Sequence, residues 1–260
     1  MAEQGLVTRL DERGIGWLTI DRPDRMNALD GATADRLVAT LADWSENPDV
    51  RVVVITGVGK AFSTGADIVD MAQAEPPKDA EEAAERAAQT IDGGSDLARA
   101  VRDTRVPVIA AVNGAAAGVG ASLAIAADLI YASEKAYFLL PFVNIGLMPD
   151  GGATATVAAA MGRARAAAVA LLGEKLSATD AFEAGLITAV VPPDDLEAVV
   201  DTAAGKIAAK PRRAMELTKA ALNGSSLAGL EDAFARERSG QIELLQSAEF
   251  RSAIAQFSAK

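Results

Sequence analysis

The stretch that decides the fold of this chain reads VPVIAAVNGAAAGVGAS over residues 106–122. Its β-branched apolar beginning, residues 106–112, predicts a buried strand. The Asn113–Gly114 pair predicts the turn that ends this strand, and Gly118 marks the expected start of a helix. Small residues around Gly118 leave no bulk over the backbone, so a ligand oxygen could approach the unpaired N–H groups at the helix's positive end. We interpret this stretch as half of an oxyanion hole or an anion cradle.

A carboxylate follows in the same segment. The sequence YFLLPFVNIGLMPDGG over residues 137–152 places Asp150 on a Pro-Asp-Gly-Gly turn before another expected helix. By its local pattern, Asp150 is explained equally well as a catalytic group or as a helix N-cap that stabilises by about 1 kcal/mol. An oxyanion-binding turn and a carboxylate in one segment suggest acid–base chemistry beside a developing negative charge.

The composition excludes several classes of function. The chain has 260 residues, a formal net charge of −11, no Cys and no His. The acidic balance argues against general nucleic-acid binding, which needs a basic face. Without Cys or His there are no disulfides, no thiolate chemistry, no Ser-His-Asp triad and no imidazole metal ligands. Acid–base work must therefore fall to Asp, Glu, Lys or Tyr, or to water that they hold.

Membrane insertion and secretion are not expected. No stretch of about 20 apolar residues is free of charge, so the sequence predicts no membrane span. The first twenty residues lack the basic and apolar regions of a signal peptide. Together with the absence of Cys, this pattern favours a cytoplasmic enzyme.

Alternating strand and helix patterns predict an α/β core over residues 1–195, followed by an α-helical segment over residues 196–260. Strands are expected at residues 6–11, 16–20, 51–56, 106–112, 128–132 and 187–191. Helices are expected at residues 32–44, with Asp30 as N-cap, at residues 80–103, and after the capping-box pattern of residues 177–180. Residues 92–95, with two adjacent glycines, are a candidate break in the second of these helices.

Several motifs have competing interpretations. Gly118 and Gly120 could open a dinucleotide-binding fingerprint, but position 123 is Leu where the third Gly would stand. Ser122 could belong to a nucleophile elbow, which without His would need a Ser-Lys arrangement. We favour a small residue packed beneath the site. Asp67 follows a Gly-Ala turn and is better explained as a helix-start residue than as a catalyst.

Ordered blocks along nearly the whole chain resemble the crotonase superfamily, also called the enoyl-CoA hydratase/isomerase family. The blocks are DRPDRMNAL (21–29), VVITG (53–57), KAFSTGADI (60–68), VPVIAAVNG (106–114), ADLI (127–130), GG (151–152), AFEAGLI (181–187) and residues 250–257. The resemblance implies an α/β spiral of ββα units over residues 1–195 and a helical trimerisation segment over residues 196–260. The expected assembly is a homotrimer or a dimer of trimers.

The resemblance also implies an acyl-CoA thioester substrate, of which coenzyme A is a part, with no separate cofactor and no metal. By motif position, the backbone amides of Ala66 and Val119 would hold the thioester oxygen. Each preorganised donor in a dry site stabilises the transition state by roughly 3 kcal/mol. Substrate contacts are expected from Ala61, Phe62, Ser63, Thr64, Gly65, Asp67, Ile68, Gly118, Ser122 and Phe142, with Arg25 and Lys60 as candidate phosphate contacts.

Departures from the hydratase pattern indicate which activity to expect. The two Glu residues that hold water in enoyl-CoA hydratases fall here on Ser122 and Phe142, and neither can act as a carboxylate base. The segment around Asp150 instead resembles the double-bond isomerases, including Δ3,Δ2-enoyl-CoA isomerases and ring-opened phenylacetyl-CoA isomerases. We therefore expect a Δ3-to-Δ2 shift with Asp150 as the single base. The alternatives are a hydratase that uses Asp150 and an ordered water, and a catalytically silent acyl-CoA binder.

Overall fold

Two β-sheets form the core of the chain. In the computed structural model, which describes residues 5–73, 75 and 77–258, one sheet has six strands and the other has four. The larger sheet has the order β1 (Gly5–Leu10), β2 (Ile15–Asp21), β3 (Val52–Gly57), β5 (Val108–Val112), β7 (Leu129–Ser133) and β10 (Ala189–Val191). Only the β1–β2 hairpin of this sheet is antiparallel. The smaller sheet has the order β4 (Ala61–Ser63), β6 (Ala115–Ala117), β8 (Tyr137–Leu139) and β9 (Leu176–Ser177).

The chain visits the two sheets alternately. β5 of the larger sheet leads into β6 of the smaller one, then α4 (Val119–Ile125) returns the chain to β7, which leads into β8. The turn between β5 and β6 needs a glycine, because a Cβ on Gly114 would lie 2.0 Å from the carbonyl oxygen of Lys60. Each turn of this path contributes one strand to each sheet and one helix, as expected for a spiral of ββα units.

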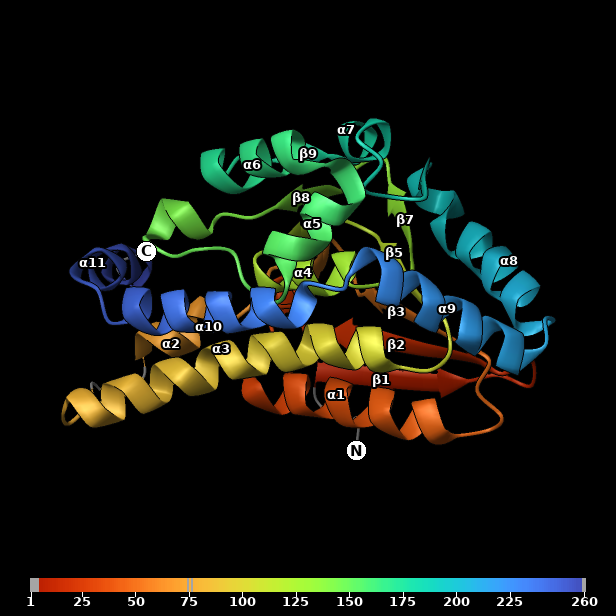
Figure 1. The fold of residues 1–260 in the computed structure, drawn as a ribbon, viewed down its shortest axis with the longest axis horizontal. Helices are drawn as coiled ribbons and strands as arrows, with labels where there is room; N and C mark the ends of the chain where they lie inside the picture. Colours follow the sequence, from red (N-terminus) through yellow and green to blue (C-terminus); the bar gives the residue numbers. More distant parts are fainter. Residues whose placement is uncertain (1–4, 74, 76, 259–260) are drawn as a thin grey trace.

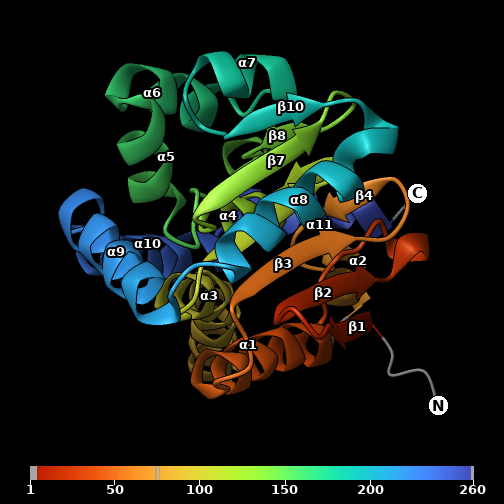
Figure 2. The same cartoon turned by 90° about the vertical axis from the view of Figure 1, so that its right-hand side faces the viewer.

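The central strands are buried on both faces, which explains their continuous apolar runs. On β3, Val53 and Ile55 face a core that includes Leu37 of α1 (Gly31–Glu46). Their neighbours Val52 and Val54 face the opposite core, which includes residues of α8 (Leu196–Ala208). Figure 2 shows α8 lying across that face of the larger sheet.

The remaining helices surround the sheets (Figure 1). They are α2 (Ile68–Gln73), α3 (Ala80–Asp103), α5 (Ala153–Met161), α6 (Arg163–Leu172), α7 (Ala178–Glu183), α9 (Arg212–Ser226), α10 (Leu230–Leu245) and α11 (Ala248–Ser258), with the short 3-10 helices η1 (Pro23–Arg25), η2 (Phe142–Ile145) and η3 (Pro193–Asp195). After Pro193 the described residues form helices only, so the predicted helical C-terminal segment is confirmed. Its role in trimer formation stays a prediction.

The candidate helix break at residues 92–95 was wrong, because α3 is continuous from Ala80 to Asp103. Each glycine inside a helix costs about 1 kcal/mol relative to Ala. Here this cost is offset by burial of one face of α3, which includes Ile91, Leu97 and Val101. Tertiary packing therefore overrides the local preference against helix. Figure 1 shows α3 running between α10 and α1.

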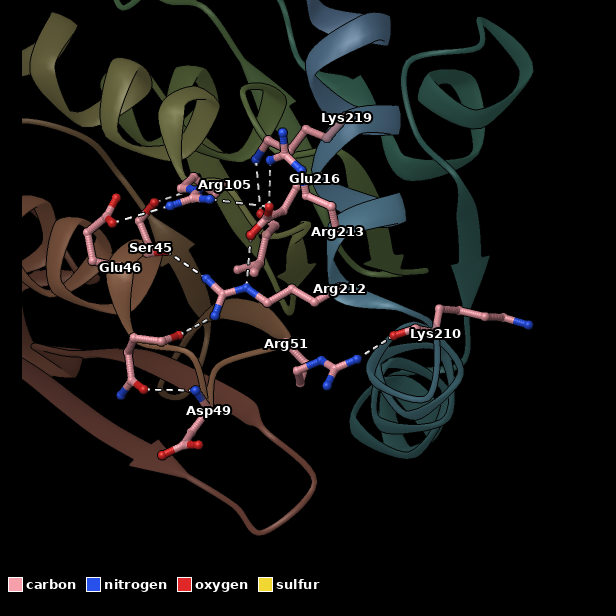
Figure 3. A network of polar contacts seen from close by, with 12 residues as sticks. Ser45, Glu46, Asp49, Arg51, Arg105, Lys210, Arg212, Arg213, Glu216 and Lys219 are labelled. Carbon is pink, nitrogen blue, oxygen red and sulfur yellow. Dashed lines mark hydrogen bonds and ion pairs between the residues drawn. The ribbon is translucent and has the colours of Figure 1, made fainter.

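An ion-pair cluster attaches α9 to the core (Figure 3). The buried carboxylate of Glu216 lies 2.9 Å from Arg212, 3.0 Å from Arg213 and 3.4 Å from Arg105. The hydrogen bond from Arg213, together with the charges of Arg105 and Arg212, holds the pKa of Glu216 below its ordinary value. Arg212 also donates a 2.8 Å hydrogen bond to the carbonyl oxygen of Ser45 near the end of α1. This cluster links the helical segment to α1 and to the start of the central stretch.

Candidate active site

Two residues with unpaired backbone amides line one cavity. Ala66 lies in a parallel bridge to Leu29, in which the Leu29 amide donates to the Gly65 oxygen and the Asp67 amide donates to the Leu29 oxygen. These bonds use the groups on either side of Ala66. Val119 is the first residue of α4, before the helix makes its own bonds. Within the described part of the chain, neither the Ala66 amide nor the Val119 amide donates a hydrogen bond.

Glycines bring these two amide-bearing segments together. Gly65 has φ +88°, and a Cβ there would lie 2.8 Å from the Ala117 oxygen and 3.0 Å from the Val119 nitrogen. Gly118, which precedes α4, has φ +54°. An L side chain is strained at positive φ, so both positions require glycine. The arrangement can place two convergent N–H donors around one ligand oxygen.

Asp150 contributes a carboxyl group to the same cavity and is only 7% exposed. Its Oδ2 accepts a 2.8 Å hydrogen bond from Nε2 of Gln241, whereas its buried Oδ1 has no partner among the described residues. Burial raises the pKa of Asp150 to about 7, and the charge of Glu237 acts in the same direction, while the hydrogen bond from Gln241 opposes both. A carboxyl group that titrates near neutral pH is suited to accept and return a proton.

The turn that carries Asp150 is held by its neighbours. The Ser122 hydroxyl donates a 2.7 Å hydrogen bond to the backbone oxygen of Asp150. Glu237 accepts hydrogen bonds from the Gly152 amide (2.8 Å), the Thr154 amide (3.0 Å) and the Thr154 hydroxyl (2.5 Å). Glu237 therefore supplies the cap at the start of α5. The interpretation of Asp150 as the N-cap was wrong, because its side chain makes no capping bond to this helix.

The cavity has a volume of about 410 Å³ and mostly apolar walls. Its apolar lining comes from several helices and includes Leu29, Ile68, Met71, Ile91, Leu97, Val119, Phe142, Ile145, Leu147, Leu245, Phe250 and Ile254. Three further acidic residues line it, namely Asp30, Asp67 and Asp70, and each is paired with Arg22 or Arg25 at 3.1–3.6 Å. Asp150 is thus the one carboxyl group of the described lining without a cationic partner.

Most residues expected at the site from the sequence do reach this cavity. Its lining includes Thr64, Ala66, Asp67, Ile68, Gly118, Val119, Phe142 and Asp150. Asp67 also begins α2, since its Oδ1 accepts a hydrogen bond from the Asp70 amide.

The remaining candidates lie off the cavity wall. Ala61, Phe62 and Ser63 are buried in β4, and the adjacent Lys60 is exposed. Arg25 pairs with Asp67 and Asp70, and Gly65 lies behind the Ala66 amide. Ser122 is fully buried beneath the Asp150 turn, as the favoured interpretation of a small packed residue predicted.

Two polar residues of the site were missed by the sequence analysis. Gln241 and Glu237 both lie on α10, one turn apart and fully buried. They continue the buried face that begins with Leu230, Ala233 and Phe234. Polar residues at core positions of an amphipathic helix are the signal that could have identified them.

A family model described as enoyl-CoA hydratase/isomerase matches residues 11–260. The chain belongs to the enoyl-CoA hydratase/isomerase family. A relative named probable enoyl-CoA hydratase, from Rhodobacter capsulatus, is 38% identical over 94% of this chain and 91% of its own. Another, named 1,2-epoxyphenylacetyl-CoA isomerase, from Escherichia coli, is 34% identical over 96% of this chain and 94% of its own.

Solved structures of the enoyl-CoA hydratase/isomerase family share the fold. A crystal structure of an enoyl-CoA hydratase from Mycobacterium avium subsp. paratuberculosis K-10 superposes with a TM-score of 0.88 at 40% identity, covering 98% of this chain and 96% of the other. The predicted crotonase-like fold is thereby confirmed. The chain is an enzyme of a family that acts on acyl-CoA thioesters, and relatives carry both hydratase and isomerase names.

Two further features of the described residues bear on expectations from the sequence. None of their helices combines the length and apolar character needed to cross a membrane. Nor do they contain a group of three or more Asp, Glu, Cys or His residues able to hold a metal ion.

Proposed function

We propose that this enzyme moves a double bond of an acyl-CoA from Δ3 to Δ2, with Asp150 as its single base. The observation that carries the proposal is the state of this carboxyl group. Its Oδ2 accepts a hydrogen bond from Gln241, while its buried Oδ1 has no hydrogen-bond partner among the described residues. One carboxyl oxygen is therefore available to move a proton within the cavity.

In the proposed reaction, the amides of Ala66 and Val119 hold the thioester oxygen while Asp150 removes a proton from C2. The electrons of the C2–H bond form a C1–C2 double bond, and negative charge develops on the held oxygen. Asp150 then returns the proton to C4, where the electrons of the C3–C4 double bond form the new C4–H bond. The electrons of the C1–C2 double bond shift to C2–C3, and the negative oxygen re-forms the carbonyl group. The two N–H donors stabilise the dienolate, and no cofactor is consumed.

The surroundings of Asp150 support isomerisation over hydration. Phe142 lines the cavity at a position where the resemblance places a water-holding Glu in hydratases. Ser122, at the position of the other such Glu, is fully buried and does not line the cavity. Apolar residues that line the same cavity, such as Leu147, favour the exclusion of water, and burial of the carboxyl group raises its pKa. The isomerase name of the Escherichia coli relative supports the same choice.

Hydration of a 2-enoyl-CoA is the second candidate, because the Rhodobacter capsulatus relative at 38% identity carries a hydratase name. In that reaction Asp150 would activate an ordered water molecule. A silent acyl-CoA binder is the third candidate, and it predicts binding without turnover.

One experiment separates the three. Purified protein is incubated with 3-hexenoyl-CoA in deuterated water, and the product is analysed by mass spectrometry and NMR. A conjugated 2-enoyl-CoA without added water supports the proposal. A 3-hydroxyacyl product supports hydration, which is checked with crotonyl-CoA. Unchanged substrate, with binding confirmed by calorimetry, supports the silent binder.

Three further expectations from the sequence remain proposals. We propose a homotrimer or dimer of trimers assembled through the helical segment of residues 196–260, which sedimentation analysis of the full chain can check. We propose a cytoplasmic location, which fractionation of cells can check. Arg25 and Lys60 remain candidate contacts for the coenzyme A phosphates, to be checked by the KM of alanine variants.

A further inference from the structure

We propose that Gln241 of α10 is a positioning residue that fixes the Asp150 carboxyl group, so that Oδ1 is the oxygen that moves the proton. The inference rests on the proposed isomerase function and deepens it. Gln241 acts through Asp150 and does not itself accept or release the proton that is transferred to the substrate.

The Gln241 amide is itself held in one orientation. Its Oε1 accepts a 3.3 Å hydrogen bond from the backbone amide of Met148, two residues before Asp150. Its NH₂ group must therefore point the other way, and it donates the 2.8 Å bond to Oδ2 of Asp150. With Gln241 only 1% exposed, water has little access to compete for these bonds. Both ends of one side-chain amide thus bind the segment that carries the carboxyl group.

The neutral charge of this donor matters for the chemistry. A Lys or Arg at hydrogen-bond distance would lower the carboxyl pKa by about 1–3 units and weaken the base. Gln241 fixes the geometry of Asp150 without a positive charge. Its hydrogen bond still favours the ionised carboxylate, but it does not overcome the effect of burial.

The same helix holds the backbone that follows Asp150. Glu237, one turn before Gln241, accepts the amides of Gly152 and Thr154 at 2.8 and 3.0 Å. The Ser122 hydroxyl donates a hydrogen bond to the backbone oxygen of Asp150. The turn is therefore fixed from several sides, and Gln241 is the described residue that bonds to the carboxyl group itself.

Few charged groups surround Asp150. On α10, Glu237 is buried and raises the pKa of Asp150, whereas Arg238 pairs at 2.7 Å with the half-exposed Asp92 of α3. Neither α4 nor α5 carries a charged residue. The other acidic residues of the cavity are paired with arginines. The two side chains that influence the pKa of Asp150, Glu237 and Gln241, both lie on α10. A change of this pKa in a Gln241 variant can therefore be assigned to the lost hydrogen bond.

The test uses Gln241→Met, which keeps the length of the side chain and removes both hydrogen bonds. We expect kcat with 3-hexenoyl-CoA to fall about 10- to 100-fold even at pH 9, where Asp150 is ionised, with little change in KM. The pKa of Asp150, followed by ¹³C NMR of the carboxyl carbon and assigned with Asp150→Asn, should move upward. Gln246→Met, at the end of the same helix, is the matched control and should change neither quantity.

A second variant keeps the test decisive if Gln241→Met folds poorly. In Gln241→Glu two facing carboxyl groups share a proton, so the pair should titrate in two separated steps, the upper one above pH 7. An unchanged Asp150 titration in the variants would overturn the proposal. A fall in kcat with a lower Tm and no shift of the titration would assign Gln241 to folding alone. Because the NMR titration needs no turnover, failure of the isomerase assay in the wild type would count against the proposed function and not against this role.

Discussion

Nε2 of Gln241 lies 2.8 Å from Oδ2 of Asp150, although 91 positions separate the two residues in the chain. The bond joins α10 of the helical segment to a turn of the α/β core. The candidate site is therefore complete only when the C-terminal helices are packed in place. If the C-terminal helices detached from the core, the Asp150 carboxyl group would lose the hydrogen bond from Gln241.

Replacing the proposed base should remove catalysis and spare binding. Asp150→Asn keeps the shape of the side chain but cannot accept a proton from carbon. We expect kcat for isomerisation to fall about 10²- to 10⁴-fold, the usual contribution of a general base. Calorimetry should show that the product 2-enoyl-CoA still binds. If most of the activity is retained, Asp150 is not the base.

The same substitution should change how stability depends on pH. Burial and the charge of Glu237 raise the pKa of Asp150 from 3.8 to about 7. Because the pKa of Asp150 is higher in the folded state than in the unfolded state, its protonated form adds to the free energy of unfolding. This contribution is fully present below pH 4 and is lost as the pH rises through about 7. Relative to wild type, Asp150→Asn should gain roughly 2–4 kcal/mol of unfolding free energy between pH 4 and pH 8. Urea unfolding at several pH values measures this difference, and a constant difference would contradict the shifted pKa.

The pH profile of the wild-type enzyme should reflect the same carboxyl group. We expect kcat/KM to rise with pH through an apparent pKa near 7, because the base must be ionised. Glu237→Gln removes a nearby negative charge and should move this limb to lower pH. The exposed Glu243 of the same helix provides the control, since Glu243→Gln should leave the profile in place. A movement in the opposite direction would contradict the assignment of Glu237.

Phe142 should control access of water to the bound dienolate. Phe142→Leu shortens a side chain that lines the cavity, so more deuterium from D₂O should enter C2 and C4 of the product. The control is Phe138→Leu in β8, which shortens another buried Phe that is not part of the described cavity wall. Equal deuterium content in both variants would show that Phe142 does not exclude water.

The ion pair between the buried Lys219 and the partly exposed Asp128 should contribute to stability and not to catalysis. Nζ of Lys219 lies 2.8 Å from Oδ2 of Asp128 and also donates to the carbonyl oxygens of Val101 and Val106. Lys219→Met leaves the Asp128 carboxylate with the hydrogen bond from the Val108 amide and removes the partner of the two carbonyl oxygens, which should cost about 1–3 kcal/mol in urea unfolding. The exposed Lys210 gives the control Lys210→Met, which should leave the unfolding free energy nearly unchanged. An unchanged midpoint in Lys219→Met would refute this role.

Local patterns were sufficient for much of the architecture. The strand, turn and helix start around residues 106–122 follow from β-branched runs and glycines, whose effects act over a few neighbouring residues. The cap of α1 by Asp30 was also predicted, and its side chain accepts the Thr33 amide. The unpaired amides of Ala66 and Val119 line one cavity with Asp150, and all three had been singled out from motif positions.

Other features depended on contacts between distant segments. Glu237 caps α5 from α10, so nothing near Asp150 in the chain could show that the local N-cap interpretation was wrong. The continuity of α3 depends on packing of its buried face against α1 and α10, which local helix propensity does not include.

The amino-acid sequence by itself determined the family, the alternation of strands and helices, the exclusion of His and Cys chemistry, and the candidate base Asp150. Only the tertiary structure decided how that base is held and which of its oxygens is free. The physical reason is that a side-chain hydrogen bond depends on position within about an ångström. Gln241 reaches Asp150 only after α10 has packed against the core, and a glutamine on an amphipathic helix carries no chemical signal of its own.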